Sequence, residues 1–376
     1  MARINIVNKI INGIYILIAI AATFQFLEYC GKNFPFEFFI NYNHGPIKRG
    51  FIGSILFQIC SFNNFQSTIF IKNVVFFLVV MNIFLIAFAV IKKKLDFFIL
   101  FTSTMLLNIY GKNIPFRLDL VIIPLFIFQL YILKTTRLKV NSKLILTSIL
   151  LCLGIAIHEI YFLICSACFI YIIRYVLNQK DVKSYFSVFI VPFITFIVFT
   201  FFYKGNEVQI SKVIFDWTAF GTNPNDLKYL NWLFSIPSGG IYIWNNINFT
   251  NSMIPAIGFI LNYIILCWLY YFFLNHFYDL SSRKNRLLIF TNFSIILLLS
   301  CVAEDFIRWF YFMFIITLFY FLIFERKKDI AISPTYVVHK FIFLLIGTPM
   351  VGNWNISLFI WSSPLRMLKY YYYLMV

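Results

Sequence analysis

The sequence alternates between long apolar runs and short polar breaks, a pattern that predicts membrane-spanning helices. A helix needs about 20 largely apolar residues to cross the hydrocarbon core of a bilayer. Spans are predicted near residues 10–28, 69–91, 95–110, 120–134, 144–160, 161–178, 185–203, 253–275, 287–304, 309–324 and 337–352, with a short twelfth near 355–370. We therefore expect an all-α polytopic integral membrane protein with about 11 (10–12) transmembrane helices, forming a single domain over residues 1–376.

Two apolar segments need a separate interpretation. The run GFIGSILFQIC at 50–60 is too short to cross a bilayer, so we predict a re-entrant or interfacial helix on the outer side. In the first span, alanines near residue 20 resemble a signal-peptide cleavage site. The apolar run continues through 24–27, however, so this span is predicted to be an anchor.

The distribution of Lys and Arg predicts the orientation of the spans. With the N-terminus in the cytoplasm, the cytoplasmic breaks hold about twice as many basic residues as the outer breaks, as the positive-inside rule requires. The longest break, residues 204–252, then becomes an outer loop. The same distribution explains the net charge of +17 without a nucleic-acid partner, because the basic residues lie in small clusters between spans rather than in a soluble basic domain.

Composition supports the membrane assignment and offers little evidence of cofactor chemistry. The chain is 61% hydrophobic and only 12% charged, which is far from the composition of soluble domains. Cys165 and Cys168 form a CxxC in the middle of a predicted span, with no second pair nearby, so we interpret them as packing residues. No phosphate-binding glycine loop or dinucleotide fingerprint is present. We therefore predict no metal and no cofactor.

Four polar clusters interrupt or border the apolar runs, and all four fall on the predicted outer side. They are NHGPIKRG (43–50) with His44, Lys48 and Arg49; IPFRLD (114–119) with Arg117 and Asp119; IHEIYF (157–162) with His158 and Glu159; and AEDFIRW (303–309) with Glu304, Asp305 and Arg308. Ionisable groups in such runs are costly and are functional-site candidates by default. Arginine suits phosphate recognition, whereas Glu, Asp and His are the usual general acids and bases.

Each cluster also has a purely structural interpretation. Glu304 and Asp305 are spaced to pair with Arg308 along a helix, and Arg117 has the same option with Asp119. Residues 43–50 could form an interfacial turn whose basic residues contact lipid headgroups. The His-Glu pair at 158–159 lacks the second His of a zinc-binding HExxH helix. The aromatic residues of 204–252 fit either sugar stacking or an interfacial belt.

In layout, the chain resembles the bacterial O-antigen polymerases of the Wzy type. The features that carry the resemblance are a Phe- and Ile-rich chain of about eleven spans, the long loop 204–252, and outer-face residues that include Arg49, Arg117, Glu159 and Arg308. The resemblance implies inverting, metal-independent glycosyl transfer between undecaprenyl-diphosphate-linked glycans at the periplasmic face of the inner membrane. A chain-length regulator protein is an implied partner.

The resemblance also implies roles for the candidate residues. A base would deprotonate the acceptor hydroxyl, and Glu159, His158 and Asp305 are the catalytic candidates. The substrate-binding candidates are His44, Lys48, Arg49, Arg117, Asp119, Glu304 and Arg308. The three arginines would offset the negative charge of the diphosphate leaving group.

Two alternative functions stay open. Other polyprenyl-phosphate-dependent glycosyltransferases often use an acidic residue in the first outer loop, where Glu28 and Glu37 lie. A lipid-linked oligosaccharide flippase should carry charges along a central cavity on both sides of the bilayer. The clustering of ionisable groups at one face argues against a flippase.

Overall fold

The computed structural model is almost entirely helical, as the apolar runs predict. It describes residues 5–18, 20, 35–63, 65–93, 95, 118–203, 205–227, 230, 264, 267–268, 271–272, 274–300, 306–328, 333–346, 348–349 and 361–362. Two very short antiparallel strands, β1 (Thr348–Pro349) and β2 (Trp361–Ser362), accompany the helices. The chain divides into two compact units, one of residues 1–29, 83–112 and 239–376 and the other of residues 30–82 and 113–238.

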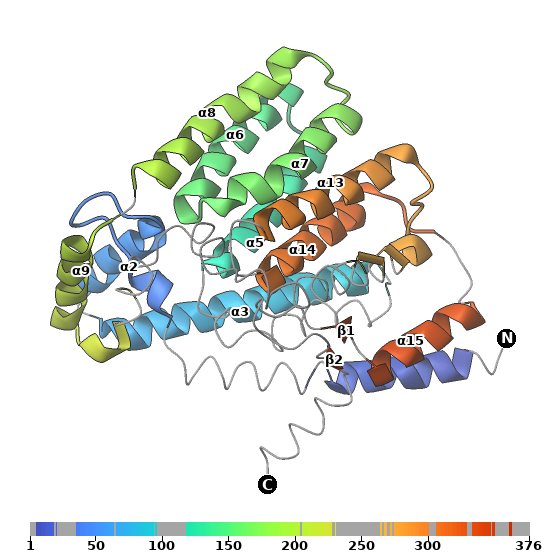
Figure 1. The fold of residues 1–376 in the computed structure, drawn as a ribbon, viewed down its shortest axis with the longest axis horizontal. Coiled ribbons are helices and arrows are strands. Elements are labelled where there is room, and N and C mark those ends of the chain that lie inside the picture. Colours follow the sequence, from blue (N-terminus) through green and yellow to red (C-terminus); the bar gives the residue numbers. More distant parts are fainter. Residues whose placement is uncertain are drawn as a thin grey trace, which may run out of the picture. The chain divides into compact units, whose positions relative to one another are not determined.

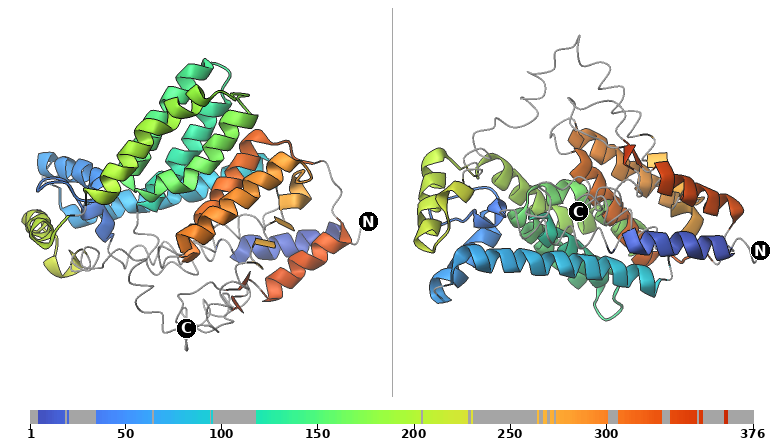
Figure 2. Two further views of the ribbon diagram at one scale, coloured as in Figure 1. Left: turned by 45° about the horizontal axis from the view of Figure 1, so that its top comes forward. Right: turned by 90° about the horizontal axis from the view of Figure 1, so that it is seen from below.

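The unit formed by 30–82 and 113–238 contains most of the described helices. They are η1 (Phe36–Phe39), α2 (Gly50–Asn63), the first part of α3 (Ser67–Lys92), α5 (Asp119–Lys134), α6 (Val140–Ile157), α7 (Ile160–Tyr175), α8 (Val182–Phe201), α9 (Glu207–Ala219) and η3 (Pro224–Leu227). Helix α6 packs against α5, α7 and α8, so the four form a bundle of neighbouring helices (Figures 1 and 2). Asn82 donates from Nδ2 to the Leu120 carbonyl at 2.9 Å and thereby ties α3 to the start of α5.

The second unit contains two described helix pairs. In the first, α13 (Arg283–Ser300) packs against α14 (Phe306–Phe324), and Asn292 donates to the Thr317 hydroxyl at 2.9 Å. In the second, α15 (Pro334–Ile346) lies beside the N-terminal helix Asn5–Ile18 (Figure 1). There the buried Lys340 ammonium donates to Asn8 Oδ1 at 2.8 Å. In each of these two helix pairs, a polar contact among apolar side chains therefore joins the helices.

The apolar helices agree with a protein embedded in a membrane. Among the described residues, three helices are long and apolar enough to cross one: α3, α6 and α8. Several predicted spans correspond to observed helices, although the helix predicted at 10–28 begins at Asn5. The predicted span 95–110 and most of 253–275 lie outside the described residues. The total of about 11 spans and the orientation of the chain stay predictions.

The short helix predicted at 50–60 is present as α2, with 14 residues. Its length of about 21 Å is less than the thickness of a hydrocarbon core. A Cβ on Gly53 would lie 1.8 Å from the Ile40 carbonyl oxygen, so only glycine allows α2 to approach the chain after η1 this closely. Ser54 completes the contact, because its hydroxyl accepts from the Tyr42 amide at 2.8 Å. This packing positions the loop 40–49 between η1 and α2.

The two ends of the α5–α8 bundle differ in charge. The short connections at 135–139 and 176–181 lie at one end, which is rich in Lys and Arg. The opposite end contains the start of α5, the break between α6 and α7, and the end of α8 (Figure 1). The buried carboxylates of Glu37 and Asp119 are at this second end, which the positive-inside rule assigns to the outer side.

Candidate functional site

A group of ionisable side chains meets at the less basic end of the bundle. We call Glu37, Arg49, Asp119, His158 and Glu159 the charged cluster. Arg49 is its centre: Nη1 donates to Glu37 Oε1 at 3.0 Å, and Nη2 donates to Glu159 Oε1 at 3.2 Å. Arg49 Nε also donates to Glu159 Oε2 at 3.4 Å, which makes the contact to Glu159 bidentate. One arginine therefore joins two carboxylates that are far apart in the sequence.

The backbone of the loop 40–49 aims Arg49 at its partners. Arg49 has a φ of 64°, in the left-handed region that non-glycine residues seldom adopt. It is followed directly by Gly50, the first residue of α2. A strained backbone of this kind costs about 1–3 kcal/mol and persists only where surrounding contacts over-determine it. The two ion pairs of Arg49 supply such contacts.

The break between α6 and α7 places Glu159. His158 leaves the helical region, with φ −155° and ψ 117°, and Glu159 returns to it directly before α7. The Glu159 carboxylate therefore lies at a helix N-terminus, where a negative charge is favoured. His158 is 1% exposed, and its Nδ1 lies 3.4 Å from Glu159 Oε2. The two-residue break thus exposes a carboxylate to Arg49 while it buries the neighbouring imidazole.

Glu37 joins the cluster to the start of α5. Its side chain is fully buried, although it belongs to the aromatic-rich helix η1. While Oε1 accepts from Arg49, Oε2 accepts from the Leu118 backbone N–H at 3.1 Å. Leu118 directly precedes α5, so Glu37 satisfies one of the amide groups that a helix start leaves without an intrahelical partner. Asp119, in the first turn of α5, is buried beside it.

At Arg49 and Glu159, nearby opposite charges together shift the pKa further than burial shifts it in the other direction. Burial by itself raises the pKa of Glu159, but the charges of Arg49, His158 and Lys48 together hold that pKa well below its ordinary value. For Arg49, burial lowers the pKa, but the charges of Glu159 and Glu37 raise it above its ordinary value. Both groups are therefore charged at neutral pH, and the Glu159 carboxylate is a weak base.

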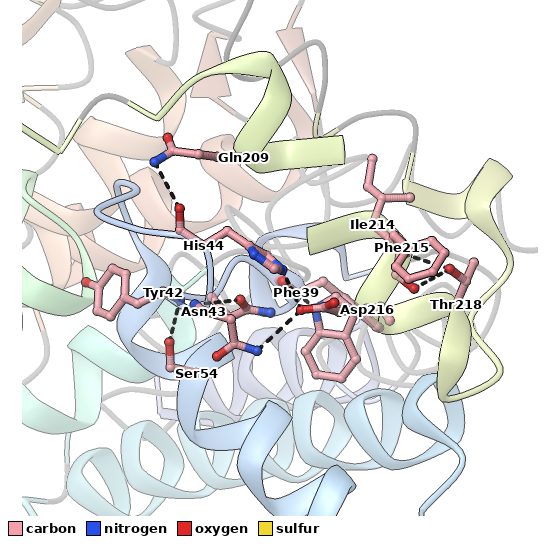
Figure 3. A network of polar contacts seen from close by, with 12 residues as sticks. Phe39, Tyr42, Asn43, His44, Ser54, Gln209, Ile214, Phe215, Asp216 and Thr218 are labelled. Atoms are coloured by element: carbon pink, nitrogen blue, oxygen red, sulfur yellow. Dashed lines mark hydrogen bonds and ion pairs between the residues drawn. The ribbon is translucent and has the colours of Figure 1, made fainter. Parts of the chain in front are cut away.

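A second polar contact group joins the loop 40–49 to α9 (Figure 3). His44 Nε2 lies 2.8 Å from Asp216 Oδ2, and Gln209 Nε2 donates to the His44 carbonyl at 3.1 Å. Trp217 is fully buried on the same helix, and its Nε1–H donates to the Phe39 carbonyl at 2.6 Å. Helix α9 is therefore held against the same loop that ends at Arg49.

The structure places some of the sequence-predicted residues together and leaves others outside its description. Arg49, Asp119, His158 and Glu159 meet in the charged cluster, and the charge of Lys48 acts on Glu159. His44 is bound to Asp216 instead. Predicted residues outside the described part of the chain are Arg117, Glu304 and Asp305; Arg308 lies in α14, but its side chain is not described.

The sequence interpretation missed two partners and misjudged one aromatic residue. The sequence interpretation assigns Glu37 only to a rival function, although an acid inside FPFEFF is as unusual as the other polar interruptions. Asp216 gave no signal in the sequence, because an Asp on an amphipathic helix is normally solvated. Trp217 neither stacks on a sugar nor lies in an interfacial belt, since it packs edge-on against Phe39 and Phe57.

Comparison of the sequence with protein-family models, with curated proteins and with solved structures finds no match.

Proposed function

We propose that this chain is a glycosyltransferase of the bacterial inner membrane that polymerises O-antigen repeat units carried on undecaprenyl diphosphate. The observation that carries the proposal is the partly buried Glu37–Arg49–Glu159 arrangement at the end of α5–α8 that the positive-inside rule assigns to the outside. Holding a cation between carboxylates in a largely apolar surround is costly, and ionisable groups that interrupt or border the apolar runs of a membrane protein are functional-site candidates. The outer leaflet is where lipid-linked repeat units would be joined.

Arg49 is suited to stabilise the negative charge that develops on a leaving diphosphate. Its contacts to Glu37 and Glu159 use three N–H groups, and a guanidinium has five. The remaining two can bind an anion, while the carboxylates hold the group rigidly. A preorganised charge of this kind needs no reorganisation when the reaction occurs.

A diphosphate bound at this site would need further cations, because the positive charges of the cluster already face carboxylates. Those carboxylates belong to Glu37, Asp119 and Glu159, and the positive charges of Lys48 and His158 act on Glu159 together with that of Arg49. Arg117 comes directly before Leu118, whose amide binds Glu37. We therefore include Lys48 and Arg117 in the proposed diphosphate site.

The position of Glu37 favours a second candidate function. Other polyprenyl-phosphate-dependent glycosyltransferases use an acidic residue of the first outer loop, and Glu37 contacts Arg49 from that segment. In this second candidate, Glu37 acts in catalysis and the donor carries a single sugar. Loss of transfer in Glu37→Gln, with transfer retained in Glu159→Gln, would favour the second candidate over polymerisation.

The test is a lipopolysaccharide gel of cells with this gene deleted, beside the parent and a complemented strain. Collapse of the ladder to core plus a single repeat unit is the expected result, because assembly and export would continue without polymerisation. Loss of the single unit as well would point to the second candidate or to a flippase. An unchanged ladder in the deletion strain would refute a role in O-antigen synthesis.

A further inference from the structure

The side chains of His44 and Asp216 have the arrangement of a general base and the carboxylate that orients it. Asp216 Oδ2 contacts His44 Nε2 at 2.8 Å, which fixes the proton on Nε2 and leaves Nδ1 as the acceptor. Among the described residues, Nδ1 makes no hydrogen bond. Both side chains are partly accessible, at 27% for His44 and 23% for Asp216. The free nitrogen can therefore receive a proton from a bound hydroxyl and return it to water.

The carboxylates of the charged cluster are poorly suited to the same task. Both oxygens of Glu159 accept from Arg49, and both oxygens of Glu37 accept from Arg49 or the Leu118 amide. Glu37 is also fully buried, so a proton taken there would have no route to solvent. These carboxylates hold a cation in place. Asp119 and His158 are buried as well, at 2% and 1% exposure, so a base that can exchange its proton with solvent must come from outside the cluster.

Other contacts already hold α9 on the loop, so the ion pair is not required for that purpose. Trp217 is buried between aromatic rings and donates to the Phe39 carbonyl, while Gln209 donates to the His44 backbone. Among the described residues, the titratable group that contacts the His44 side chain is Asp216 of α9, and Asn43 Nδ2 donates to the same Asp216 oxygen at 3.5 Å (Figure 3). The His44–Asp216 pair is thus an additional contact in an interface that Trp217 and Gln209 already hold together.

His44 also lies on the same loop as the proposed diphosphate site. Only four residues separate it from Arg49. The aromatic ring of Tyr42, two residues before His44, lies against Gly50, where a Cβ would meet it at 2.4 Å. The charge of Glu159 acts on Tyr42. One short segment therefore contacts both the charged cluster and α9.

We propose that His44 is the general base of the glycosyl transfer and that Asp216 is its positioning residue, an inference that rests on the proposed function. The acceptor hydroxyl gives its proton to His44 Nδ1 as its oxygen bonds to the anomeric carbon of the donor glycan. The bond between that carbon and the diphosphate oxygen breaks, and undecaprenyl diphosphate leaves with the electron pair. The imidazolium, paired with Asp216, then releases its proton to water.

The test measures elongation by membranes from the deletion strain that carry each variant. The substrate is the undecaprenyl-diphosphate-linked repeat unit extracted from the deletion strain. General base catalysis contributes roughly 10²- to 10⁴-fold, so His44→Gln should slow elongation by about 100-fold or more. Asp216→Asn should slow it less, with most of the effect on kcat. Gln209→Ala is the matched control, because it removes a contact between the same segments and leaves the imidazole intact.

A further readout separates catalysis from a structural role. Added imidazole should partly restore elongation by the His44→Ala variant. Equal losses in His44→Gln and Gln209→Ala, with no rescue by imidazole, would overturn the assignment of the base.

If parent membranes do not elongate the extracted repeat unit, the proposed function fails and the assignment of the base fails with it. If parent membranes elongate it and His44→Gln does so at the parent rate, only the assignment of the base is wrong.

Discussion

Replacing Arg49 by leucine should destabilise the unit formed by 30–82 and 113–238. The change leaves the carboxylates of Glu37 and Glu159 facing each other without a cation, in a region where Glu37 is fully buried and Glu159 is 18% exposed. Removing one partner of a buried ion pair costs about 3–5 kcal/mol. For a unit of this size, each kcal/mol corresponds to roughly 2–4 °C in Tm. The expected fall in Tm is therefore about 6–20 °C.

The assay is thermal unfolding of the purified protein in detergent, at neutral and acidic pH. In the parent, the pKa of Glu159 is lowered, so its pairing with Arg49 stabilises the fold above the ordinary carboxyl pKa. That stabilisation is lost as the pH falls through the lowered value. In Arg49→Leu, the unpaired carboxylates take up protons at higher pH, which relieves their repulsion. The difference in Tm between variant and parent should therefore shrink below about pH 5.

Two control variants test whether the fall in Tm is specific to Arg49 and to its bidentate contact. Arg137→Leu is the same substitution at an exposed position, where surface changes are usually within about 0.5 kcal/mol. Arg49→Lys keeps the charge but loses the bidentate fork, so its fall in Tm should lie between those of the two leucine variants. A Tm for Arg49→Leu equal to that of Arg137→Leu at neutral pH would refute the central role of Arg49 in this unit.

Three further outcomes follow from the structure. Gly53→Ala should abolish folding of the native unit, which is measured as loss of the monodisperse peak in detergent chromatography. Gly13→Ala should keep that peak, because a Cβ at Gly13 meets nothing within 4 Å. Trp217→Ala should cost about 3–5 kcal/mol and release α9 for cleavage in limited proteolysis; protection equal to that of the parent would contradict the anchoring role. In a cysteine-free background, Arg137→Cys should react with an impermeant thiol reagent only from the cytoplasm and Lys212→Cys only from outside, and the reverse result would invert the topology.

The helices themselves follow from short-range information in the sequence. In a bilayer, each span must satisfy its backbone hydrogen bonds internally, so its existence depends on its own apolar run. The prediction of α3, α6 and α8 as apolar helices is confirmed for this reason. The short length of α2 could also be predicted, because a largely apolar run of only eleven residues, 50–60, separates Arg49 from the polar residues that follow.

The composition of the charged cluster was only partly readable. The unusual positions of Arg49, His158 and Glu159 could be recognised one at a time, because each interrupts or borders an apolar stretch. Their pairing could not, since Arg49 and Glu159 are 110 positions apart and no sequence period encodes such a contact. The sequence shows that Glu37 is an unusual acid, but it does not predict that Glu37 is the second partner of Arg49.

The sequence by itself determined the class of the protein, the sites of its apolar helices and the residues that are costly to bury, because hydrophobicity acts locally along the chain. Only the tertiary structure decided which of those residues meet. The close approach allowed by Gly53, the left-handed backbone of Arg49 and the packing of α9 bring distant polar groups together. Such pairings depend on how helices pack, and packing is a property of the whole fold.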